Sequence, residues 1–397
     1  MAERLFHQCG HNWVWNRRAL EDDACGSGLI LSPVHTKPSD VHKLDRKTKS
    51  RSLFDPQFYL PNSQKKKLKS YPFFPDTIAG DNFQTDDFSL VALKAAELCL
   101  EFQVDNGFRA LVIPARYLDQ MHRDFTERQE VYTVDPFLKV ITRRKLKLPV
   151  YLTLPLTQHM VLDAGFRTEI LNWVTSFPEI NGVYLIVGND SGQKQIQSKN
   201  FLVAYLDFLR ALRAADLEVL CGYCNTEGLL ATLVEGCDIT FGSFENTRMF
   251  TIDKFVMSDE ERRGPKPRIF LPGLLNWIQF SQAKDIREAN RKIWARTYDR
   301  TQYAENVLNA AVEPYFNQEP LYRHHFIVFS RMCGELRKLS PIDRYKTLRG
   351  WLKTALELYA EIDNIPIDLE KHSQGGHIQV WLDVVNEYFR KYLKSAA

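Results

Sequence analysis

Short apolar runs, separated by longer amphipathic stretches, recur along most of the chain. Eight of them are rich in β-branched or aromatic residues and are bounded by glycine, proline or polar residues, as strands are. Apolar residues fill most positions of these runs, which is typical of strands buried on both faces. They lie at Leu29–Pro33, Ser52–Phe54, Arg109–Pro114, Pro149–Pro155, Gly182–Gly188, Glu218–Gly222, Asp238–Phe241 and Arg268–Pro272.

The stretches between these runs show helical periodicity. Phe88–Phe102 and Phe201–Ala214 carry apolar residues at the spacing of one helix face. The segment from Thr226 to Gly236 begins with a good N-cap residue and ends at a glycine. Strands that alternate with helices predict a parallel sheet, and about eight such units predict an α/β fold of the (β/α)8 TIM-barrel class. A doubly wound open sheet is the alternative, because closure is not visible in a sequence.

The pattern becomes almost wholly helical after about residue 284, as in "PIDRYKTLRGWLKTALELYAEI". We therefore predict two regions. Residues 1–283 form a (β/α)8 barrel with an N-terminal extension, and residues 284–397 form added C-terminal helices packed on the barrel.

The composition bears on the cellular compartment in which the protein is expected. With 397 residues, 44% of them hydrophobic, the chain can bury a large core. No apolar run is long enough to span a membrane, and the start lacks the pattern of a signal peptide. Seven scattered cysteines suit reduced thiols in the cytoplasm, where we expect the protein. Cys221 and Cys224 form a C-x-x-C without a second pair, which favours buried small side chains over a zinc site.

The net charge of +3 decides little, but the basic residues are clustered. Runs such as "KLDRKTKSR", "KKKLK" and "RRKLK" are most simply solvated loops. Several of them together also suit a polyanion partner, because Lys and Arg neutralise phosphates. The predicted contacts to a nucleic-acid backbone are Lys43, Arg46, Lys47, Lys65, Lys66, Lys67, Arg143 and Arg144.

The active site of a barrel lies at the carboxyl ends of its strands. In "RSLFDPQFYLP", Asp55 follows an apolar run and precedes a proline, which suits either a catalytic carboxylate or a simple turn. The other strand ends are rich in amides and aromatics, which suit a base taken out of a nucleic-acid stack but would also bind a sugar or an amino acid. Carboxylates and histidines are too dispersed there for a metal centre, so no metal or other cofactor is expected. The predicted substrate-binding residues are Gln57, Arg116, Tyr117, Gln158, Asn189, Tyr223, Asn225 and Arg248.

The order of these segments resembles the tRNA-guanine transglycosylases and their DNA-acting relatives. "LILSPVHT" is similar to their first strand, and "SLFDPQFYL" to their aspartate-bearing second strand. "LCGYCNTEGLLATLVEGCDITFGSFENTR" is similar to a long segment of the same family. The resemblance implies a (β/α)8 barrel that breaks the N-glycosidic bond of a base in a polynucleotide, with Asp55 as a catalytic carboxylate.

Two departures from the family pattern change what is expected. "LYRHHF" is similar to the stretch with the family's zinc histidine, but no cysteines precede it, so no zinc is expected and His324 and His325 are expected to be structural. The family's nucleophilic aspartate would fall near Phe241 or Gly242, where no carboxylate stands. Without that nucleophile, an activated water would hydrolyse the bond.

The leading hypothesis is therefore a DNA glycosylase that flips a modified base into the barrel mouth. By analogy with anti-phage glycosylases, the base is a glucosylated hydroxymethylcytosine of phage DNA, and DNA is expected rather than tRNA. The first alternative is base exchange in tRNA or DNA, with Glu245 or Asp190 as the nucleophile. A barrel that binds nucleic acid or a partner protein without catalysis, and an enzyme for a small sugar or nucleoside, are the others.

Overall fold

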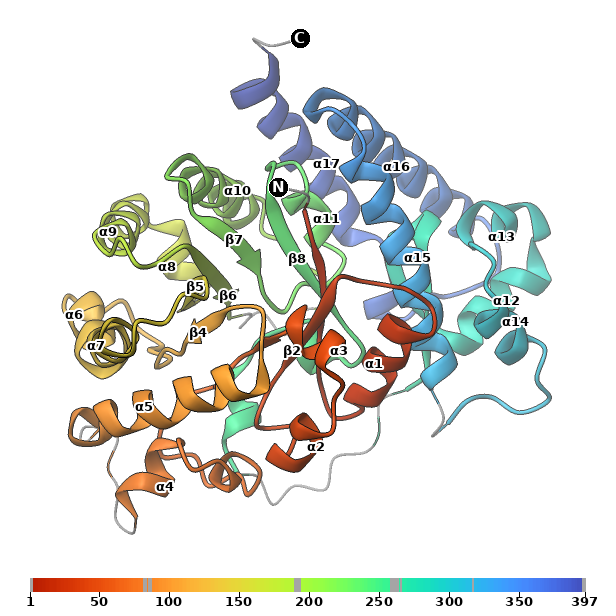
Figure 1. The fold of residues 1–397 in the computed structure, drawn as a ribbon. Coiled ribbons are helices and arrows are strands. Elements are labelled where there is room, and N and C mark those ends of the chain that lie inside the picture. The colour runs from red at the N-terminus through yellow and green to blue at the C-terminus, as the bar shows by residue number, and fades with distance from the viewer. Residues whose placement is uncertain are drawn as a thin grey trace.

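The computed structural model describes residues 3–80, 84, 88–188, 194–257, 264, 266–315 and 318–394. Eight parallel strands form one sheet in the order β3-β2-β1-β8-β7-β6-β5-β4. The amide of Arg109, just before β4, donates to the carbonyl of Ser52, just before β3, at 3.0 Å. The sheet is thus nearly closed into a TIM-type barrel, the predicted fold class (Figure 1). Its strands are β1 (Leu5–Gln8), β2 (Gly28–Leu31), β3 (Leu53–Phe54), β4 (Leu111–Ile113), β5 (Val150–Leu156), β6 (Gly182–Val187), β7 (Glu218–Cys221) and β8 (Cys237–Gly242).

Helices connect the strands and cover the outside of the barrel (Figure 1). The predicted helical stretches at Phe88–Phe102 and Phe201–Ala214 are confirmed as α5 and α10. The helices between the barrel strands are α1 (Trp13–Glu21), α2 (Pro38–His42), α3 (Arg46–Ser50), α4 (Pro75–Ala79), α5 (Phe88–Asn106), α6 (Phe125–Gln129), α7 (Asp135–Arg144), α8 (Gln158–Leu162), α9 (Ala164–Thr175), α10 (Lys199–Ala214) and α11 (Gly228–Ala231).

The predicted set of barrel strands is wrong in one member at each end. The first strand is β1, which no apolar run in the sequence indicates, so "LILSP" belongs to the second strand. β1 reads "LFHQ", and the polar His7 and Gln8 are both completely buried in it. His7 is accommodated by the carbonyl of Cys25 at 2.9 Å and the side chain of Asn16 at 3.3 Å. A four-residue run with two polar members gives no hydrophobic signal, although the fold buries it fully.

The eighth predicted strand, Arg268–Pro272, lies outside the barrel. It forms β9 (Arg268–Leu271), which pairs antiparallel with β10 (Asn276–Gln279) in a separate two-stranded sheet. The helix expected from Thr226 is also much shorter than predicted. It is reduced to the four residues of α11, which has Glu227 and not Thr226 as its N-cap residue. The hydroxyl of Thr226 accepts instead from the side chain of Gln195 at 3.4 Å.

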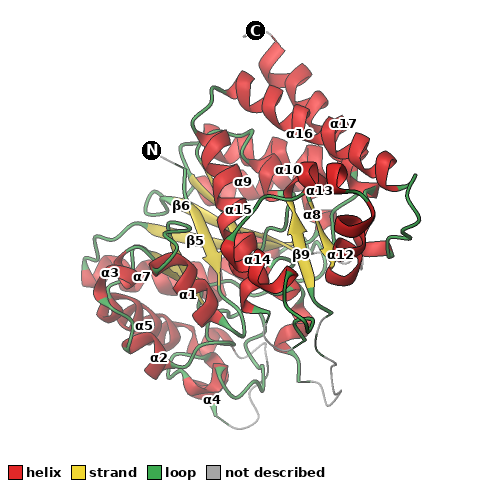
Figure 2. Ribbon diagram, turned by 90° about the vertical axis from the view of Figure 1, so that its right-hand side faces the viewer, coloured by secondary structure: helices red, strands yellow, loops and turns green. Residues whose placement is uncertain are grey.

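The C-terminal helices pack directly on the barrel (Figure 2). α15 lies beside α1, and its Phe326 packs against His7 at 4.8 Å and Phe241 at 5.2 Å between ring centroids. Trp381 donates its indole N–H to the carbonyl of Ile196 at 2.8 Å, on the other side of the barrel. None of the described helices is long and apolar enough to cross a membrane. These added helices are α12 (Phe280–Ala289), α13 (Arg291–Thr297), α14 (Gln302–Leu308), α15 (Glu319–Arg337), α16 (Pro341–Ile362) and α17 (Gly376–Tyr388).

Candidate active site

Asp55 lies at the carboxyl end of β3, inside the barrel mouth. The preceding Phe54 packs outward, 4.9 Å from the ring of Phe102 on α5, and strand alternation therefore turns Asp55 inward. The backbone amide of Asp55 continues the sheet by donating to Leu31 at 2.9 Å. Only 1% of Asp55 is exposed. The structure thus places this carboxyl group where a barrel enzyme does its chemistry.

Neutral groups hold the Asp55 carboxylate. Its Oδ2 accepts a hydrogen bond from the hydroxyl of Tyr59 at 2.9 Å, and its Oδ1 accepts from the backbone N–H of Gln57 at 3.1 Å. Burial raises the pKa of Asp55 to about 7, although the hydrogen bond from Tyr59 opposes the shift. A carboxyl group with this pKa exchanges a proton near neutral pH, as a general acid or base must.

Gln57 connects Asp55 to the opposite wall of the mouth. Its side chain accepts from the amide of Val34 at 3.1 Å and donates to the hydroxyl of Tyr223 at 3.3 Å. Both Gln57 and Tyr223 have positive φ, at 58° and 54°. Non-glycine residues in this conformation store backbone strain, and such strain gathers at functional sites. Two strained residues in direct contact therefore mark the turn around Asp55 as a candidate site.

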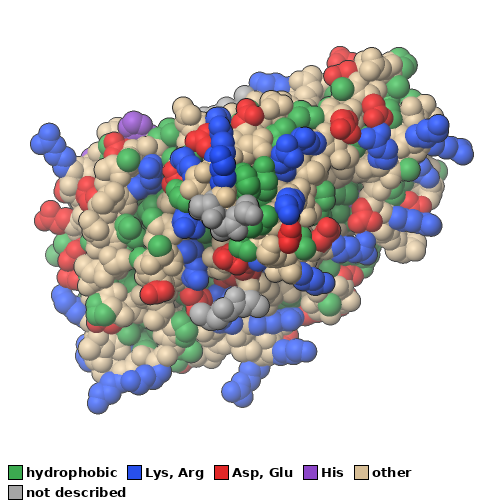
Figure 3. All heavy atoms as spheres, turned by 90° about the horizontal axis from the view of Figure 1, so that it is seen from above, with side chains coloured by type: hydrophobic (Ala, Val, Ile, Leu, Met, Phe, Trp, Pro, Cys, Tyr) green, Lys and Arg blue, Asp and Glu red, His purple; other side chains and the backbone are tan. Residues whose placement is uncertain are grey.

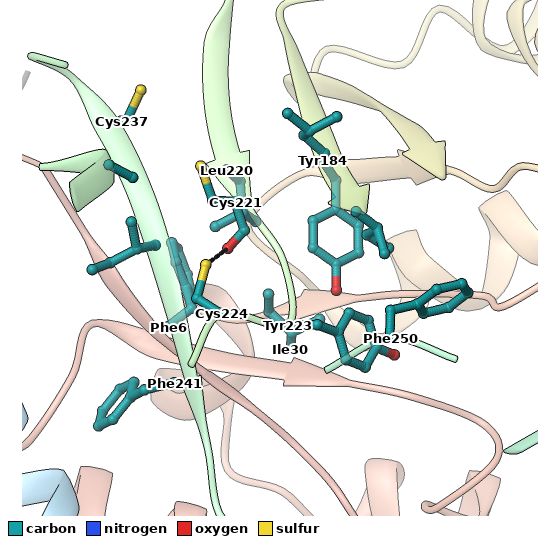
Figure 4. Packing of buried hydrophobic residues seen from close by; sticks show 14 of the residues in the cluster. Phe6, Ile30, Tyr184, Leu220, Cys221, Tyr223, Cys224, Cys237, Phe241 and Phe250 are labelled. Atoms are coloured by element: carbon teal, nitrogen blue, oxygen red, sulfur yellow. Dashed lines mark hydrogen bonds between the residues drawn. The ribbon is translucent and has the colours of Figure 1, made fainter. Parts of the chain in front are cut away.

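Aromatic rings surround the carboxyl group. The ring of Phe250 lies 5.1 Å from Tyr59, 5.3 Å from Tyr223 and 5.5 Å from Tyr117. Figure 4 shows Tyr184 from β6 beside Tyr223 and Phe250. Phe250 follows β8 and is completely buried among these rings, so the mouth is closed above Asp55.

An amide lies below the rings. Gln8, at the end of β1, accepts through its Oε1 from the hydroxyl of Tyr184 at 2.9 Å and from the amide of Tyr223 at 3.4 Å. Its Nε2 is buried without a hydrogen-bond partner in the structure. Buried polar atoms are nearly always satisfied, so this donor is available to a substrate group.

Lys254 is the cation of the mouth. Its Nζ lies 3.7 Å from the ring centroid of Tyr223 and 5.0 Å from that of Phe250, and it donates to the carbonyl of Asn246 at 3.4 Å. Among the described residues, no carboxylate lies within ion-pair distance of it. Burial lowers the pKa of Lys254 to about 7, and the charge of Asp55 opposes that shift. Asp55 and Lys254 thus titrate in the same range and influence each other.

The predicted binding residues divide between two places. Gln57, Tyr117 and Tyr223 lie in the mouth with Asp55. Gln158 begins α8 just after β5, so it also lies at this end of the barrel. Arg116 follows β4 and stacks over the ring of Tyr132, 5.3 Å from its centroid. Asn189 and Asp190 lie outside the described residues.

Glu245, Asn225 and Arg248 form a second cluster beside the mouth. Glu245 pairs with Lys194 at 2.5 Å. Burial opposes its ionisation, but Lys194, with Arg248 and Arg268, holds the pKa of Glu245 below its usual value. Base exchange with Glu245 as the nucleophile would require Glu245 to lie beside Asp55. The structure does not bring these two residues together. Asn225 accepts from Arg248 at 3.4 Å, so these two predicted residues stay together.

The basic runs also separate. Lys65 and Lys67 lie near the mouth, since Lys67 donates to the carbonyl of His35 at 2.8 Å just after β2. Burial lowers the pKa of His35 to about 3, with further contributions from Lys254, Lys67 and Lys65. Lys66 and the three predicted contacts on the β2–β3 connection, Lys43, Arg46 and Lys47, are exposed.

Arg143 and Arg144 are not near the mouth. They end α7, whose C-terminus precedes the start of β5 at the opposite end of the barrel. Arg143 pairs there with Glu97 at 2.5 Å, and Arg144 with Glu101 at 4.0 Å. Figure 3 views the molecule from the side toward which both termini lie, and Lys and Arg are interspersed with Asp and Glu there. The structure does not join these two arginines to a phosphate-binding surface around Asp55.

Several members of the site were not found from the sequence. Gln8 lies on strand β1, which was not predicted. Tyr184 lies in the middle of a predicted strand, where the sequence indicates only that an aromatic residue belongs to the hydrophobic core. Phe250 and Lys254 follow β8, Phe250 in a loop and Lys254 in a single 3-10 turn (Ile252–Phe255), and no periodicity in the sequence indicates their place. Of these residues, Tyr59 is the one that its position in the sequence could have indicated, because it follows Asp55 by four residues, beyond a proline turn.

The two histidines expected to be structural, His324 and His325, lie on α15 and not in the barrel mouth. His324 contacts the carbonyl of Phe270 and the hydroxyl of Thr301, both at 2.9 Å. His325 packs against Trp277, with ring centroids 4.5 Å apart. Within the described part of the chain, no three His, Cys, Asp or Glu side chains group as a metal site would.

The fold and the site together define a TIM-type barrel with a buried carboxyl group, Asp55, at its mouth, whose pKa is raised to about 7. Comparisons with protein-family models, with curated proteins and with solved structures each find no match to this chain.

Proposed function

We propose that this protein is a DNA glycosylase that hydrolyses the N-glycosidic bond of a modified base and leaves an abasic site. The observation that carries the proposal is the buried Asp55 carboxyl at the barrel mouth, with a pKa of about 7. Such a group takes a proton from water near neutral pH and stabilises the positive charge of an oxocarbenium-like transition state.

In the proposed step, the oxygen of a water molecule bonds to C1′ of the deoxyribose while the C1′–N bond breaks. The electron pair of that bond leaves with the base. Asp55 accepts one proton of the water, and that proton is then passed on to the departed base, so that Asp55 returns to its ionised form. A covalent, retaining mechanism needs a second group close to the first, as paired carboxylates about 5 Å apart provide in glycoside hydrolases. Among the described residues, the hydrogen bonds and ion pairs of the mouth bring no second carboxylate to Asp55, because Glu227 and Glu245 lie in the cluster around Arg248. This favours direct hydrolysis over base exchange.

The surroundings of Asp55 suit a flipped base. Aromatic rings such as Tyr223 and Phe250 stack on heteroaromatic faces, and the amides of Gln8 and Gln57 offer hydrogen bonds to a base edge or an attached sugar. Lys65 and Lys67 would contact flanking phosphates. Since Phe250 closes the mouth, entry of a base requires this side chain to move aside.

The identity of the base rests on analogy. A glucosylated hydroxymethylcytosine of phage DNA, removed in antiviral defence, fits the resemblance to base-removing barrels and the polar lining of the mouth. The seven cysteines agree with work in the cytoplasm, because all of them are buried thiols.

An abasic-site assay tests the proposal. Purified protein is incubated with unmodified DNA, glucosylated phage DNA and tRNA, and strand scission is measured after alkaline treatment. Scission of one DNA, lost in Asp55→Asn, is the expected result. Asp207→Asn is the matched control, because Asp207 contacts Lys391 and Tyr392 on the outside of the barrel. Absence of abasic sites in every substrate would contradict hydrolysis, and a covalent protein–DNA adduct would point to base exchange.

A further inference from the structure

The cluster around Arg248 lines a small, partly open pocket beside the mouth, with a cavity volume of about 10 Å³. Asn225 and Arg248 line it from the ends of β7 and β8, and Trp277 lines it from β10. It therefore lies where the barrel meets the hairpin. A second pocket, with a cavity volume of about 40 Å³, shares Arg248 with the first and reaches Tyr223.

Arg248 is buried without a directly paired counter-ion, and Glu245 and Glu227 act on it only at longer range. Only 6% of it is exposed, and its guanidinium lies over the ring of Trp277, 4.0 Å from the centroid. No described carboxylate lies within ion-pair distance of it. Burial lowers the pKa of Arg248 to about 10, yet it stays charged at neutral pH. A buried charge without an ionic partner is costly, which indicates that an anion belongs beside it.

The neighbouring cations already have partners. Lys194 pairs with Glu245 at 2.5 Å, and Arg268 pairs with Glu370. Glu245 and Glu370 therefore each form their ion pair with another cation and not with Arg248. Of the three cations that line the first pocket, Arg248 alone has no carboxylate partner among the described residues.

Buried polar atoms in the pocket wall also lack partners. The Nε of Arg248 and the indole N–H of Trp277 are buried donors without an acceptor, and Gln195 has an unpartnered Oε1. Unsatisfied buried groups are rare in folded proteins, and two donors in one pocket wall suit a ligand with several acceptor oxygens.

Glu227 lines the second pocket, and its protonation state affects the binding of an anion at Arg248. Its Oε1 accepts from the amide of Asn225 at 2.8 Å, and its Oε2 has no partner. Burial raises the pKa of Glu227 to about 7. When protonated, its free oxygen can donate to a ligand; when ionised, it repels an anion at Arg248.

We propose that Arg248, with Trp277 and Asn225, forms an oxyanion-binding site separate from the Asp55 centre. Its ligand carries a phosphate, sulfate or carboxylate group that accepts hydrogen bonds from the guanidinium. The proposal does not depend on glycosylase activity, because it rests on the unmet charge and unsatisfied donors of this pocket alone.

Calorimetric titration of the full chain with sulfate, which does not titrate between pH 6 and pH 8, tests the site. Arg248→Met is expected to weaken sulfate binding at least tenfold, because it removes the cation and its donors. Arg323→Met is the matched control. Arg323 is also buried but pairs with Asp23 at 2.7 Å, so its loss should lower stability and leave sulfate affinity unchanged.

A second variant keeps the test independent of the folding of Arg248→Met. Glu227→Gln removes the ionisable neighbour and is expected to tighten sulfate binding several-fold at pH 8. Parallel titrations with a nucleoside monophosphate and a short single-stranded oligonucleotide distinguish a small phosphate ligand from a polynucleotide backbone. Equal binding of all probes to wild type and Arg248→Met, or no measurable binding of any of them to wild type, would overturn the proposal.

Discussion

Asp238, near the start of β8, and Asp55, at the end of β3, are both buried aspartates of the barrel, but their partners differ. Asp238 accepts from the side-chain Nε of Arg4 at 2.7 Å and from its backbone N–H at 2.5 Å. Asp55 accepts only from neutral donors, and the nearby Lys254 lies over aromatic rings instead of pairing with it. Asp238 therefore has a cation in direct contact with its carboxylate, and Asp55 does not.

The surroundings of Asp238 extend this pairing. Arg4 also donates to Glu218 and, at 3.0 Å, to the hydroxyl of Tyr151. Burial would raise the pKa of Glu218, but hydrogen bonds from Tyr151 and Arg4 hold it below its usual value. This cluster ties β1, β5, β7 and β8 together where the strands begin. In barrels that end serves stability, while the opposite end serves chemistry, and the distribution of charge partners here follows that division.

The largest expected effect is the loss of activity in Asp55→Asn. An amide cannot accept the proton of water, so the single-turnover rate of base release should fall by a factor of about 10²–10⁴. Rates measured on the substrate that the abasic-site assay selects, with Asp207→Asn beside it, check this. A rate within threefold of wild type would show that Asp55 is only a turn residue.

Asp238→Asn should have the opposite profile. It removes a carboxylate partner from the partly buried Arg4, which keeps Glu218 and the hydroxyl of Tyr151, and should lower the free energy of unfolding by about 3 kcal/mol. The rate per folded molecule should stay near that of wild type, because Asp238 lies at the other end of the barrel from Asp55. Urea denaturation and the single-turnover assay measure the two properties separately. Lost activity at full stability would overturn the division between the two ends.

The stability of Asp55→Asn relative to wild type should depend on pH. The folded pKa of about 7 lies above the ordinary value of 3.8, so the fold favours protonated Asp55 and loses stability as pH rises between those values. Asparagine has no such loss. Its advantage in unfolding free energy should be absent below pH 4, grow up to pH 7 and stay level above, reaching at most about 4 kcal/mol.

Denaturation of both proteins at several pH values measures this difference. Asp76→Asn is the control, because Asp76 is also buried but pairs with Lys69 at 2.7 Å. It should show no stabilisation at any pH. A flat difference for Asp55→Asn would mean that its carboxyl group titrates normally.

The parts of the fold and of the site that could be predicted from the sequence are those whose residues follow a local pattern. Seven of the eight predicted strands lie in the barrel, because apolar runs between turn residues are a local signal. β1 was missed because His7 and Gln8 are polar, and only tertiary contacts make their burial acceptable. Asp55 was found because it follows an apolar run directly. Lys254 was not, since the path of the segment after β8 depends on packing against distant residues such as Tyr59.

The smallest expected effect concerns Lys254 and would sharpen the contrast with Arg4. The positive charge of Lys254 lowers the pKa of Asp55 without pairing with it. Lys254→Met should therefore raise the pKa of Asp55 and move the rising limb of the pH–rate profile to higher pH, with a rate at pH 7 reduced only a few-fold. Lys66→Met, in the exposed basic run nearby, should leave the limb in place. A shift to lower pH, or loss of all activity at every pH, would mean that Lys254 takes part in the reaction itself and does more than tune its carboxylate neighbour.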